Sequence, residues 1–495
     1  VCAPLTMVDV SIMTATKFHQ VALEDDKKIG ESLITIFGCE IKLFYDYELT
    51  KSIDTEQLPT SLELPDIIYS DYEEEIVAQN KKSTGNKDIF CNHGDNAMCV
   101  NCAPVSPWDP KLLRERGIKY LSFGAFKEKN QRIERLTYRN ECKHAQNVKC
   151  TRCMERTIAL KQQNYRMIDH VEIDHSKTVD NFISFWRGTG RNRFGFLLGK
   201  IKDYERVPLG KTAVVSAIYD PLQENFPDGF VVHEKECSKI RALLDYIGLD
   251  VIGMIYTDLN HKRDYLLSCT EIDAMAKFQN ENMFADDDGK VFNSRFVSVV
   301  VRNNDAGVEL EAYSVSEQGM VLIDENIIKP CTDKQTFVST HPIIYLEKNE
   351  YDLVVEKNTM RVPVEYLIVD IPHGFSEKSM FPCGTYFNPE WGKMKVAKYF
   401  TDYSLEKFQN FNVLLYFFQK FNGSDRSLNA DMKLLVDAVL GRVRIEKFLQ
   451  TFTFLKFTDS IESHRKEEWD CKICTYRNLD GTDRCEMCET QRNYG

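Results

Sequence analysis

The sequence predicts a multidomain α+β protein that carries several metal-binding fingers. Three observations indicate this fold class. The cysteines gather in tight clusters, the middle of the chain mixes strand and helix patterns without regular βαβ repeats, and the part after residue 400 is dominated by apolar helical patterns. With 495 residues, the chain has room for about three domains.

The composition is that of a folded protein with a sizeable core. Hydrophobic residues make up 43% of the chain and charged residues 28%, both ordinary values. The net charge of −12 disfavours nonspecific nucleic-acid binding, because neutralising phosphates requires clustered Lys and Arg. We expect no transmembrane helix, since no apolar run approaches the ~18 residues that a span requires. No secretory signal is evident at residues 1–10.

Residues 1–69 are expected to form a small N-terminal region that is divergent or truncated. Apolar runs at 33–37 and 41–44 predict two short strands. Residues 70–88 are first acidic and then basic, with small polar residues between. This charge pattern is typical of a linker.

An internal repeat occupies residues 89–160. The pattern Cys-x-His-x5-Cys-x2-Cys occurs twice with identical spacing. Thiolate and imidazole ligands in such clusters indicate zinc, and four ligands close the coordination shell, so the sites are expected to be structural. Sharing of ligands between the two copies stays open. The expected ligands are Cys91, His93, Cys99 and Cys102 in the first copy and Cys142, His144, Cys150 and Cys153 in the second.

Residues 161–400 are expected to form a domain with insertions, built on a central sheet. A helix is predicted at 181–186, and strands are predicted at 194–198, 213–219, 251–256, 296–301, 308–313 and 365–371. The amphipathic run 236–247 predicts a helix that ends at Gly248. A further helix is expected to begin at Ser268 or Thr270.

The C-terminal part is expected to contain a helical region, a linker and a separate small unit. Residues 401–457 are predicted to be helical with Ser404 as an N-cap, and the stretch through Phe418 is too apolar for a free surface helix. The polar segment 458–468 is expected to be a linker. Residues 469–495 form the last unit.

Two Cys-x2-Cys hooks define this last unit, and their four thiols are Cys471, Cys474, Cys485 and Cys488. Four thiolates bind one Zn²⁺ tetrahedrally. So short a unit has almost no core, so the metal must supply folding free energy, on the order of 10–16 kcal/mol in comparable peptides. Surface cysteines with coincidental spacing are the alternative. The chain is therefore expected to hold three structural zinc ions, and the six remaining cysteines are expected to be mostly small buried hydrophobes.

The terminal unit resembles the Npl4-type zinc finger class that binds ubiquitin. The resemblance rests on Trp469, the two hooks, Asn478 and the residues that carry the function in that class. It implies that Thr475, Tyr476 and Met487 contact the hydrophobic surface of ubiquitin, although the class usually has Phe where Tyr476 stands. A single-stranded RNA finger is the rival, but it needs Arg or Lys around a stacking aromatic residue, and the charges here are mixed.

Residues 192–273 resemble the MPN (JAMM-like) fold, whose active members are zinc-dependent deubiquitinases. The resemblance rests on the strand Gly195-Phe196-Leu197-Leu198-Gly199 and on Ser268 at a helix start. Active members use a Glu to activate water and two His and one Asp to bind zinc. The corresponding positions here are Asn192, Tyr256, Asp258 and Glu271. Because an amide is no general base near neutral pH, the resemblance implies an inactive scaffold, or pseudoenzyme.

The order of these parts resembles the nuclear protein localization protein 4 family over roughly residues 70–495. The paired Cys-x-His fingers, the degenerate MPN motifs, the stretch Pro363–Phe375 and the terminal finger carry the resemblance. The family has an amino-terminal ubiquitin-like domain, and its signature is not clear in residues 1–60.

The resemblance implies an adaptor and not an enzyme. Members of the family bind polyubiquitin and pair with ubiquitin fusion degradation protein 1. The pair recruits ubiquitinated proteins to the hexameric AAA ATPase called valosin-containing protein for unfolding, extraction and proteasomal degradation, including degradation from the endoplasmic reticulum (ER). A cytoplasmic and nuclear location with recruitment to the ER surface follows. A zinc-dependent deubiquitinase and an RNA-binding finger protein are the alternatives.

Overall fold

The computed structural model describes most of the chain after residue 105 and two short segments before it. The described residues are 31–36, 39–44, 105–130, 135–138, 157–233, 237–260, 265–285, 291–304, 307–348, 351, 353–376, 378–423, 427–465, 468–479, 484 and 487. The predicted linker 70–88 and all eight expected ligands of the internal repeat lie outside the described residues.

The chain divides into two compact units, which we call the sheet unit and the helical unit. The sheet unit comprises residues 1–236 and 251–376, and the helical unit comprises residues 237–250 and 377–495. The boundary expected near residue 400 thus falls at residue 376. In addition, a short segment within the expected central domain belongs to the helical unit.

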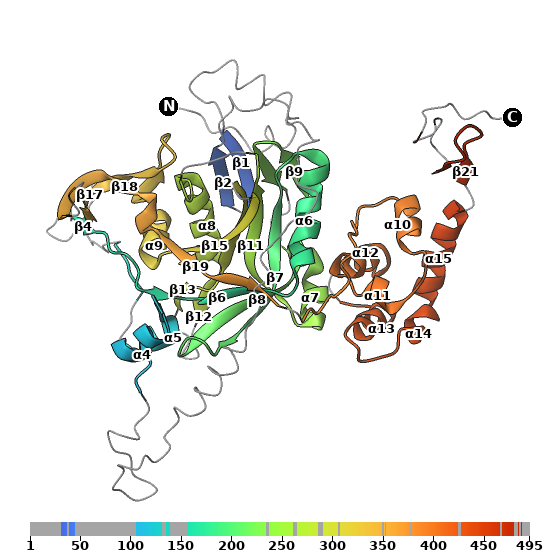
Figure 1. Cartoon of the computed structure of the whole chain (residues 1–495), viewed down its shortest axis with the longest axis horizontal. Coiled ribbons are helices and arrows are strands. Elements are labelled where there is room, and N and C mark those ends of the chain that lie inside the picture. Colours follow the sequence, from blue (N-terminus) through green and yellow to red (C-terminus); the bar gives the residue numbers. More distant parts are fainter. Residues whose placement is uncertain are drawn as a thin grey trace, which may run out of the picture. The chain divides into compact units, whose positions relative to one another are not determined.

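Eight described strands form the mixed main sheet of the sheet unit (Figure 1), in the order β19-β15-β14-β11-β7-β8-β6-β20. Their bounds are β6 (His170–Ile173), β7 (Phe194–Tyr204), β8 (Gly210–Tyr219), β11 (Asp250–Asp258), β14 (Val297–Asn304), β15 (Gly307–Val315), β19 (Ile368–Ile371) and β20 (His373–Phe375). β11 pairs with β14 in parallel, whereas β7 with β8 and β14 with β15 are antiparallel pairs. The mixed α and β architecture agrees with the predicted class.

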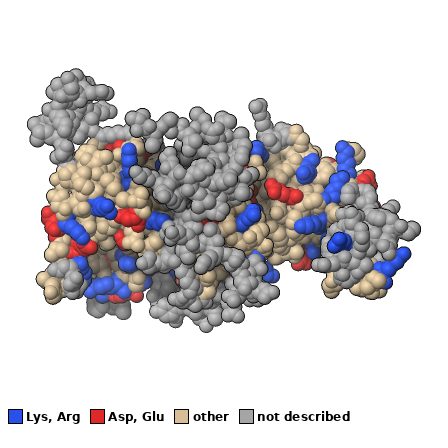
Figure 2. Space-filling view, turned by 90° about the horizontal axis from the view of Figure 1, so that it is seen from above, with Lys and Arg blue, Asp and Glu red and all other residues tan. Residues whose placement is uncertain are grey.

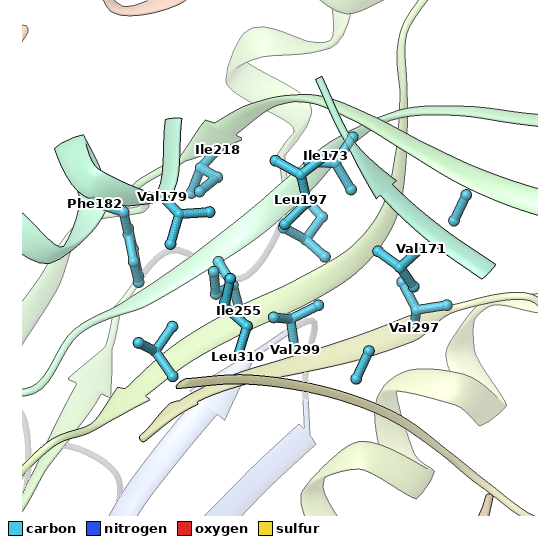
Figure 3. Packing of buried hydrophobic residues seen from close by; sticks show 14 of the residues in the cluster. Val171, Ile173, Val179, Phe182, Leu197, Ile218, Ile255, Val297, Val299 and Leu310 are labelled. Carbon is cyan, nitrogen blue, oxygen red and sulfur yellow. The ribbon is translucent and has the colours of Figure 1, made fainter. Parts of the chain in front are cut away.

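The core of the sheet unit lies between this sheet and α6 (Ser176–Thr189). Figure 3 shows Val179 and Phe182 of the helix beside Leu197, Ile218 and Ile255 of the strands. All five side chains are buried, and full burial of such a side chain stabilises the fold by about 1.5–3 kcal/mol. The apolar runs that predicted the strands are therefore the runs that fill this core.

Two helix boundaries that the sequence predicts are confirmed. The 3₁₀ helix η3 (Cys237–Ile240) leads into α7 (Arg241–Ile247), which ends at Gly248 in the left-handed conformation with φ 78°. α8 (Cys269–Glu281) begins after Ser268, whose Oγ accepts a hydrogen bond from the backbone N–H of Glu271. The Glu271 carboxylate accepts one from the N–H of Ser268 in return, so the two residues form a capping box.

A second sheet was not predicted from the sequence. It consists of β16 (Ile328–Pro330), β17 (Thr336–Lys348) and β18 (Val354–Pro363), and β4 (Ile158–Ala159) pairs in parallel with β17. α9 (Glu317–Asp324) precedes this sheet and η4 (Val364–Tyr366) follows it.

The remaining described elements of the sheet unit are short. They are β1 (Glu31–Ile36), β2 (Cys39–Phe44), α4 (Pro110–Glu115), β3 (Leu121–Ser122), α5 (Phe123–Lys129), β5 (Tyr165–Arg166), β9 (Gln223–Phe226), β10 (Gly229–Val232), β12 (Met283–Ala285) and β13 (Val291–Ser294). β1 and β2 form an antiparallel pair and correspond to the two strands predicted in the N-terminal region.

Aromatic side chains form much of the core of the helical unit. Its further helices are α10 (Lys393–Tyr399), α11 (Leu405–Phe408), α12 (Phe411–Phe421), α13 (Ala430–Val439), α14 (Glu446–Leu449) and α15 (Phe452–Arg465). Phe400, Phe417 and Phe457 are fully buried and their rings contact one another. The expectation that α12 is no free surface helix is confirmed, because its apolar side chains through Phe418 are buried. Ser404 precedes α11 but makes no capping hydrogen bond with its side chain.

α15 occupies most of the segment expected to be a linker. The helix continues through Arg465, and Ile461 within it is fully buried. Because Phe457 and Ile461 are four residues apart, they lie on one face of the helix, and both bury against the unit. Asp459 and Glu462, two of the charged residues of this segment, are exposed on the same helix. Two short strands, β21 (Glu468–Asp470) and β22 (Arg477–Leu479), follow and pair antiparallel.

Candidate functional site

The first Cys-x2-Cys hook of the terminal unit lies between β21 and β22. The backbone closes on itself there, since the N–H of Thr475 donates to the carbonyl of Cys471 over 2.8 Å and the N–H of Cys471 donates to the carbonyl of Tyr476 over 2.9 Å. Asn478 is buried and donates from Nδ2 to the same Tyr476 carbonyl over 2.9 Å. The hook is thus fixed by backbone hydrogen bonds and by one of the residues that carry the resemblance.

The thiols of this hook fit half of a zinc site. Cys471 is only 2% exposed, and Cys474 is partly exposed. Two thiols in a tight turn at this spacing supply soft ligands of the kind that tetrahedral zinc takes in pairs. Cys485 and Cys488, the predicted second pair, lie outside the described residues, and the described part of the chain holds no cluster of three or more metal-ligand side chains.

Thr475 adopts an unusual backbone conformation directly after the hook. Its φ of 56° places it in the left-handed region, which costs a residue with a Cβ about 1–2 kcal/mol and is rarer still for a β-branched side chain. Its Oγ1 donates to the carbonyl of Cys474 over 2.7 Å, and its side chain is exposed. Backbone strain of this kind is concentrated at functional sites.

Exposed apolar side chains accompany Thr475. Met487 is 70% exposed, and Ile473 is 72% exposed, while Tyr476 is half-buried. Ile473 was not among the residues predicted to bind. The sequence could have identified this residue, because Ile473 immediately precedes the second cysteine of its hook, as Met487 does in the other hook.

Asn192, at the position of the expected catalytic Glu, has a structural role. The residue is fully buried. Its Nδ2 donates to the carbonyl of Pro227 over 3.0 Å, and its Oδ1 accepts from Thr257 Oγ1 and from the N–H of Leu259. The side chain therefore joins three segments of the sheet unit through the hydrogen bonds that an amide offers, since it both donates and accepts.

Glu271, at the position of the expected metal-binding Asp, is also engaged within the fold. Its Oε1 accepts from Tyr256 Oη over 2.8 Å, and its Oε2 accepts from both N–H and Oγ of Ser268. Tyr256, Ser268 and Glu271 are all buried. Next to them, burial raises the pKa of the Cys269 thiol to about 12, so the thiol stays protonated and is a poor nucleophile or metal ligand at neutral pH.

Two further features concern the surface charge and the hydropathy of the described residues. On the face shown in Figure 2, basic and acidic side chains of the described residues are interspersed. None of the helices in the described part of the chain is long and apolar enough to cross a bilayer.

These features define a mixed α and β protein whose terminal unit carries a tight Cys-x2-Cys hook. A family model described as "NPL4 family" matches residues 193–487, and one described as "NPL4 family, putative zinc binding region" matches residues 70–190. The first match alone covers more than half of the chain, so the chain belongs to the NPL4 family. This description supports zinc binding within residues 70–190. The eight ligands expected in the internal repeat fall in that range and stay a prediction.

Relatives in fungi and in a nematode are similar over most of the chain. "Nuclear protein localization protein 4" of Vanderwaltozyma polyspora is 31% identical over 74% of this chain and 76% of the relative. The protein of that name from Saccharomyces cerevisiae is 29% identical over 69% and 68%. "Nuclear protein localization protein 4 homolog 1" of Caenorhabditis elegans is 30% identical over 72% and 79%.

Proposed function

We propose that the chain is an adaptor that binds ubiquitin chains through its terminal hook and presents tagged proteins to an AAA ATPase. The observation that carries this proposal is the strained, exposed Thr475 beside the cysteine hook, in a unit that also exposes Ile473 and Met487. Contiguous exposed apolar surface marks binding sites for another protein, and in this proposal Ile473 and Met487 belong to one such surface. Ubiquitin offers the matching apolar surface, as the resemblance to ubiquitin-binding fingers implies.

The sheet unit serves in this proposal as a scaffold of the MPN type without catalytic chemistry. Asn192 and Glu271 support that interpretation, because both are buried and their polar atoms already accept or donate hydrogen bonds within the fold. Water activation requires a general base that reaches the reacting water. Recruitment of either residue for that role requires first breaking several buried hydrogen bonds.

The family membership supports the partners of the proposal. We infer pairing with ubiquitin fusion degradation protein 1 and docking on valosin-containing protein, with the paired Cys/His repeats as the part that contacts the ATPase ring. Three structural zinc ions would hold the repeats and the terminal unit. The function then takes place in the cytoplasm, in the nucleus and at the ER surface, and it serves proteasomal degradation.

The test of the terminal site is a titration of ¹⁵N-labelled ubiquitin with the full, zinc-loaded chain. Thr475→Ala combined with Met487→Ala removes two of the three predicted contacts, and we expect affinity at this site to fall by about tenfold or more. Lys472→Ala is the matched control, because Lys472 is exposed in the same hook. Unchanged affinity of the double variant would contradict the assignment of Thr475 and Met487.

The same preparation separates the alternatives. Chelator-sensitive cleavage of ubiquitin chains would favour the deubiquitinase and would contradict the inactive scaffold. Binding of single-stranded RNA that weakens with rising salt would favour the RNA-binding finger. We expect neither activity, and we expect about three zinc ions per chain by elemental analysis.

A further inference from the structure

The sheet unit contacts the chain on both sides of the second Cys/His repeat. Residues 135–138 precede that repeat and residues 157–163 follow it. Both flanks reach α9 (Glu317–Asp324), and the first flank also reaches Glu325, the residue that follows the helix. The two described flanks of the repeat therefore converge on one short helix of the sheet unit.

The first flank is held through its backbone. The N–H of Leu136 donates to Glu317 Oε1 over 3.2 Å, and the N–H of Tyr138 donates to both carboxylate oxygens of Glu325 at 3.1 and 3.0 Å. Thr137 Oγ1 also donates to Glu325, over 2.8 Å. Hydrogen bonds to a charged acceptor are stronger than those to a neutral one, so this flank has a firm attachment.

The second flank is held by Gln318 and by β17. The N–H of Lys161 donates to Gln318 Oε1 over 2.9 Å, and Gln318 Nε2 donates to the carbonyl of Ala159 over 2.9 Å. The N–H of Leu160 donates to the carbonyl of Ile344 in β17 over 2.8 Å.

Gln318 also reaches the first flank. The Nε2 that donates to Ala159 donates to Tyr138 Oη as well, over 2.7 Å. One planar amide thus uses both of its N–H groups on opposite flanks and its oxygen on the second flank. No other amino-acid side chain of this length offers two donors and an acceptor in that geometry.

An open pocket lies beside Gln318, so these polar bonds are made near the surface of the sheet unit. Its volume is about 810 Å³, and Phe126 of α5, Tyr138, Ile158 and Gln318 are among the residues that line it. α9 itself is anchored independently, because Met320, Val321 and Leu322 are buried. Loss of the Gln318 amide should therefore loosen the flanks without unfolding the helix.

We propose that Gln318 is a positioning residue, which joins the described flanks of the second Cys/His repeat, residues 135–138 and 157–163, and holds them together on the sheet unit. Without the Gln318 amide, the first flank keeps its bonds to Glu317 and Glu325, and the second flank keeps β17 and the bond from the N–H of Glu317 to Gln163 Oε1. The bonds that join Tyr138 to the second flank through one side chain are then lost. The consequence for the ATPase rests on the proposed function, in which the repeats contact the ring.

Hydrogen–deuterium exchange on the full, zinc-loaded chain tests the positioning directly. Gln318→Ala should speed exchange at the amides of Tyr138 and Lys161 by about tenfold or more, because local opening frees those donors. Exchange in β7, β8 and β11 should stay unchanged. Gln162→Ala is the matched control, since this neighbouring glutamine is exposed, and it should leave all these amides protected. Unchanged protection in Gln318→Ala overturns the proposal.

A conservative variant separates joining from general stabilisation. Tyr138→Phe removes only the hydroxyl that accepts from Gln318 and keeps both bonds between Gln318 and the second flank, so the amide of Lys161 should stay protected while the amide of residue 138 exchanges faster. Equal acceleration at both amides would mean that the whole region had loosened, and it would overturn the specific role of the amide.

The functional arm uses the ATPase, its partner protein and a ubiquitinated substrate. We expect Gln318→Ala to slow substrate unfolding several-fold, with zinc content and ubiquitin affinity unchanged. If Gln318→Ala shows faster amide exchange but unfolds the substrate at the full rate, the positioning role of Gln318 stands. The proposed contact between the repeats and the ATPase is then contradicted.

Discussion

The centre of the sheet unit and the terminal cysteine hook differ in how their key side chains are satisfied. Around Glu271, every carboxylate oxygen accepts a hydrogen bond from a buried donor of the same fold. At the hook, the backbone is strained at Thr475, and the unit exposes Ile473 and Met487. Side chains that are satisfied internally stabilise the fold, whereas exposed and strained ones are free to bind a partner. This contrast supports the proposal that the binding site lies at the hook.

The largest effect is expected from removing a thiol of the hook. Cys471→Ser replaces a soft ligand with a hydroxyl that binds zinc poorly, and structural zinc contributes on the order of 10 kcal/mol to the folding of such units. We expect the zinc content measured by mass spectrometry to drop by one ion per chain. Binding of ubiquitin at the terminal site should be lost.

Cys383→Ala is the control for this prediction. Cys383 is a free, buried thiol of the same helical unit, and its loss should leave the zinc content unchanged. A full zinc complement in Cys471→Ser would mean that the hook does not bind the metal. The contrast between a binding site at the hook and a structural site around Glu271 would then be lost.

A smaller effect is expected at the sheet centre. Glu271→Ala leaves the hydroxyl of Tyr256 and two donor groups of Ser268 without their acceptor in a buried site. Such losses cost about 1–3 kcal/mol per group and are not additive, so we expect the free energy of unfolding of the sheet unit to fall by about 3 kcal/mol. Urea denaturation, monitored by hydrogen–deuterium exchange at the backbone amides of β11, measures this change in the free energy of unfolding.

The Glu271→Ala variant should bind ubiquitin at the hook with unchanged affinity. Ubiquitin binding therefore separates this loss of stability from a loss of function. Glu172→Ala, at a half-exposed position of β6, should change stability by less than about 0.5 kcal/mol. If Glu271→Ala were instead as stable as the parent chain, the interpretation of this carboxylate as a structural group would be wrong.

Local sequence signals predicted the parts of the fold that depend on local chemistry. Gly248 ends α7 because a residue without a Cβ adopts positive φ at little cost. Ser268 and Glu271 begin α8 because their spacing allows a capping box. The terminal hook was predicted because two Cys-x2-Cys pairs in so short a segment are typical of a tetrahedral zinc site.

The parts that were missed depend on contacts between distant residues. Gln318 meets Tyr138 and Ala159 across more than 150 positions of the sequence, and nothing in its neighbourhood indicates those partners. α15 was partly mistaken for a linker because charged residues conceal the i, i+4 pair Phe457 and Ile461. The positive φ of Thr475 is likewise invisible in the sequence, since threonine does not favour that conformation.

The smallest effect, and the one that separates stability from binding most directly, is expected at Thr475. Thr475→Asn relieves the left-handed strain, because asparagine tolerates that conformation better than a β-branched residue. We expect the terminal unit to become more stable by about 0.5 kcal/mol, which slower zinc release to a chelator would report, while ubiquitin affinity falls several-fold because the threonine contact is lost. Thr475→Gly should weaken binding similarly with less gain in stability, since glycine also loosens the unfolded chain. A variant that gains stability and keeps its affinity would show that the strain at Thr475 has no role in binding.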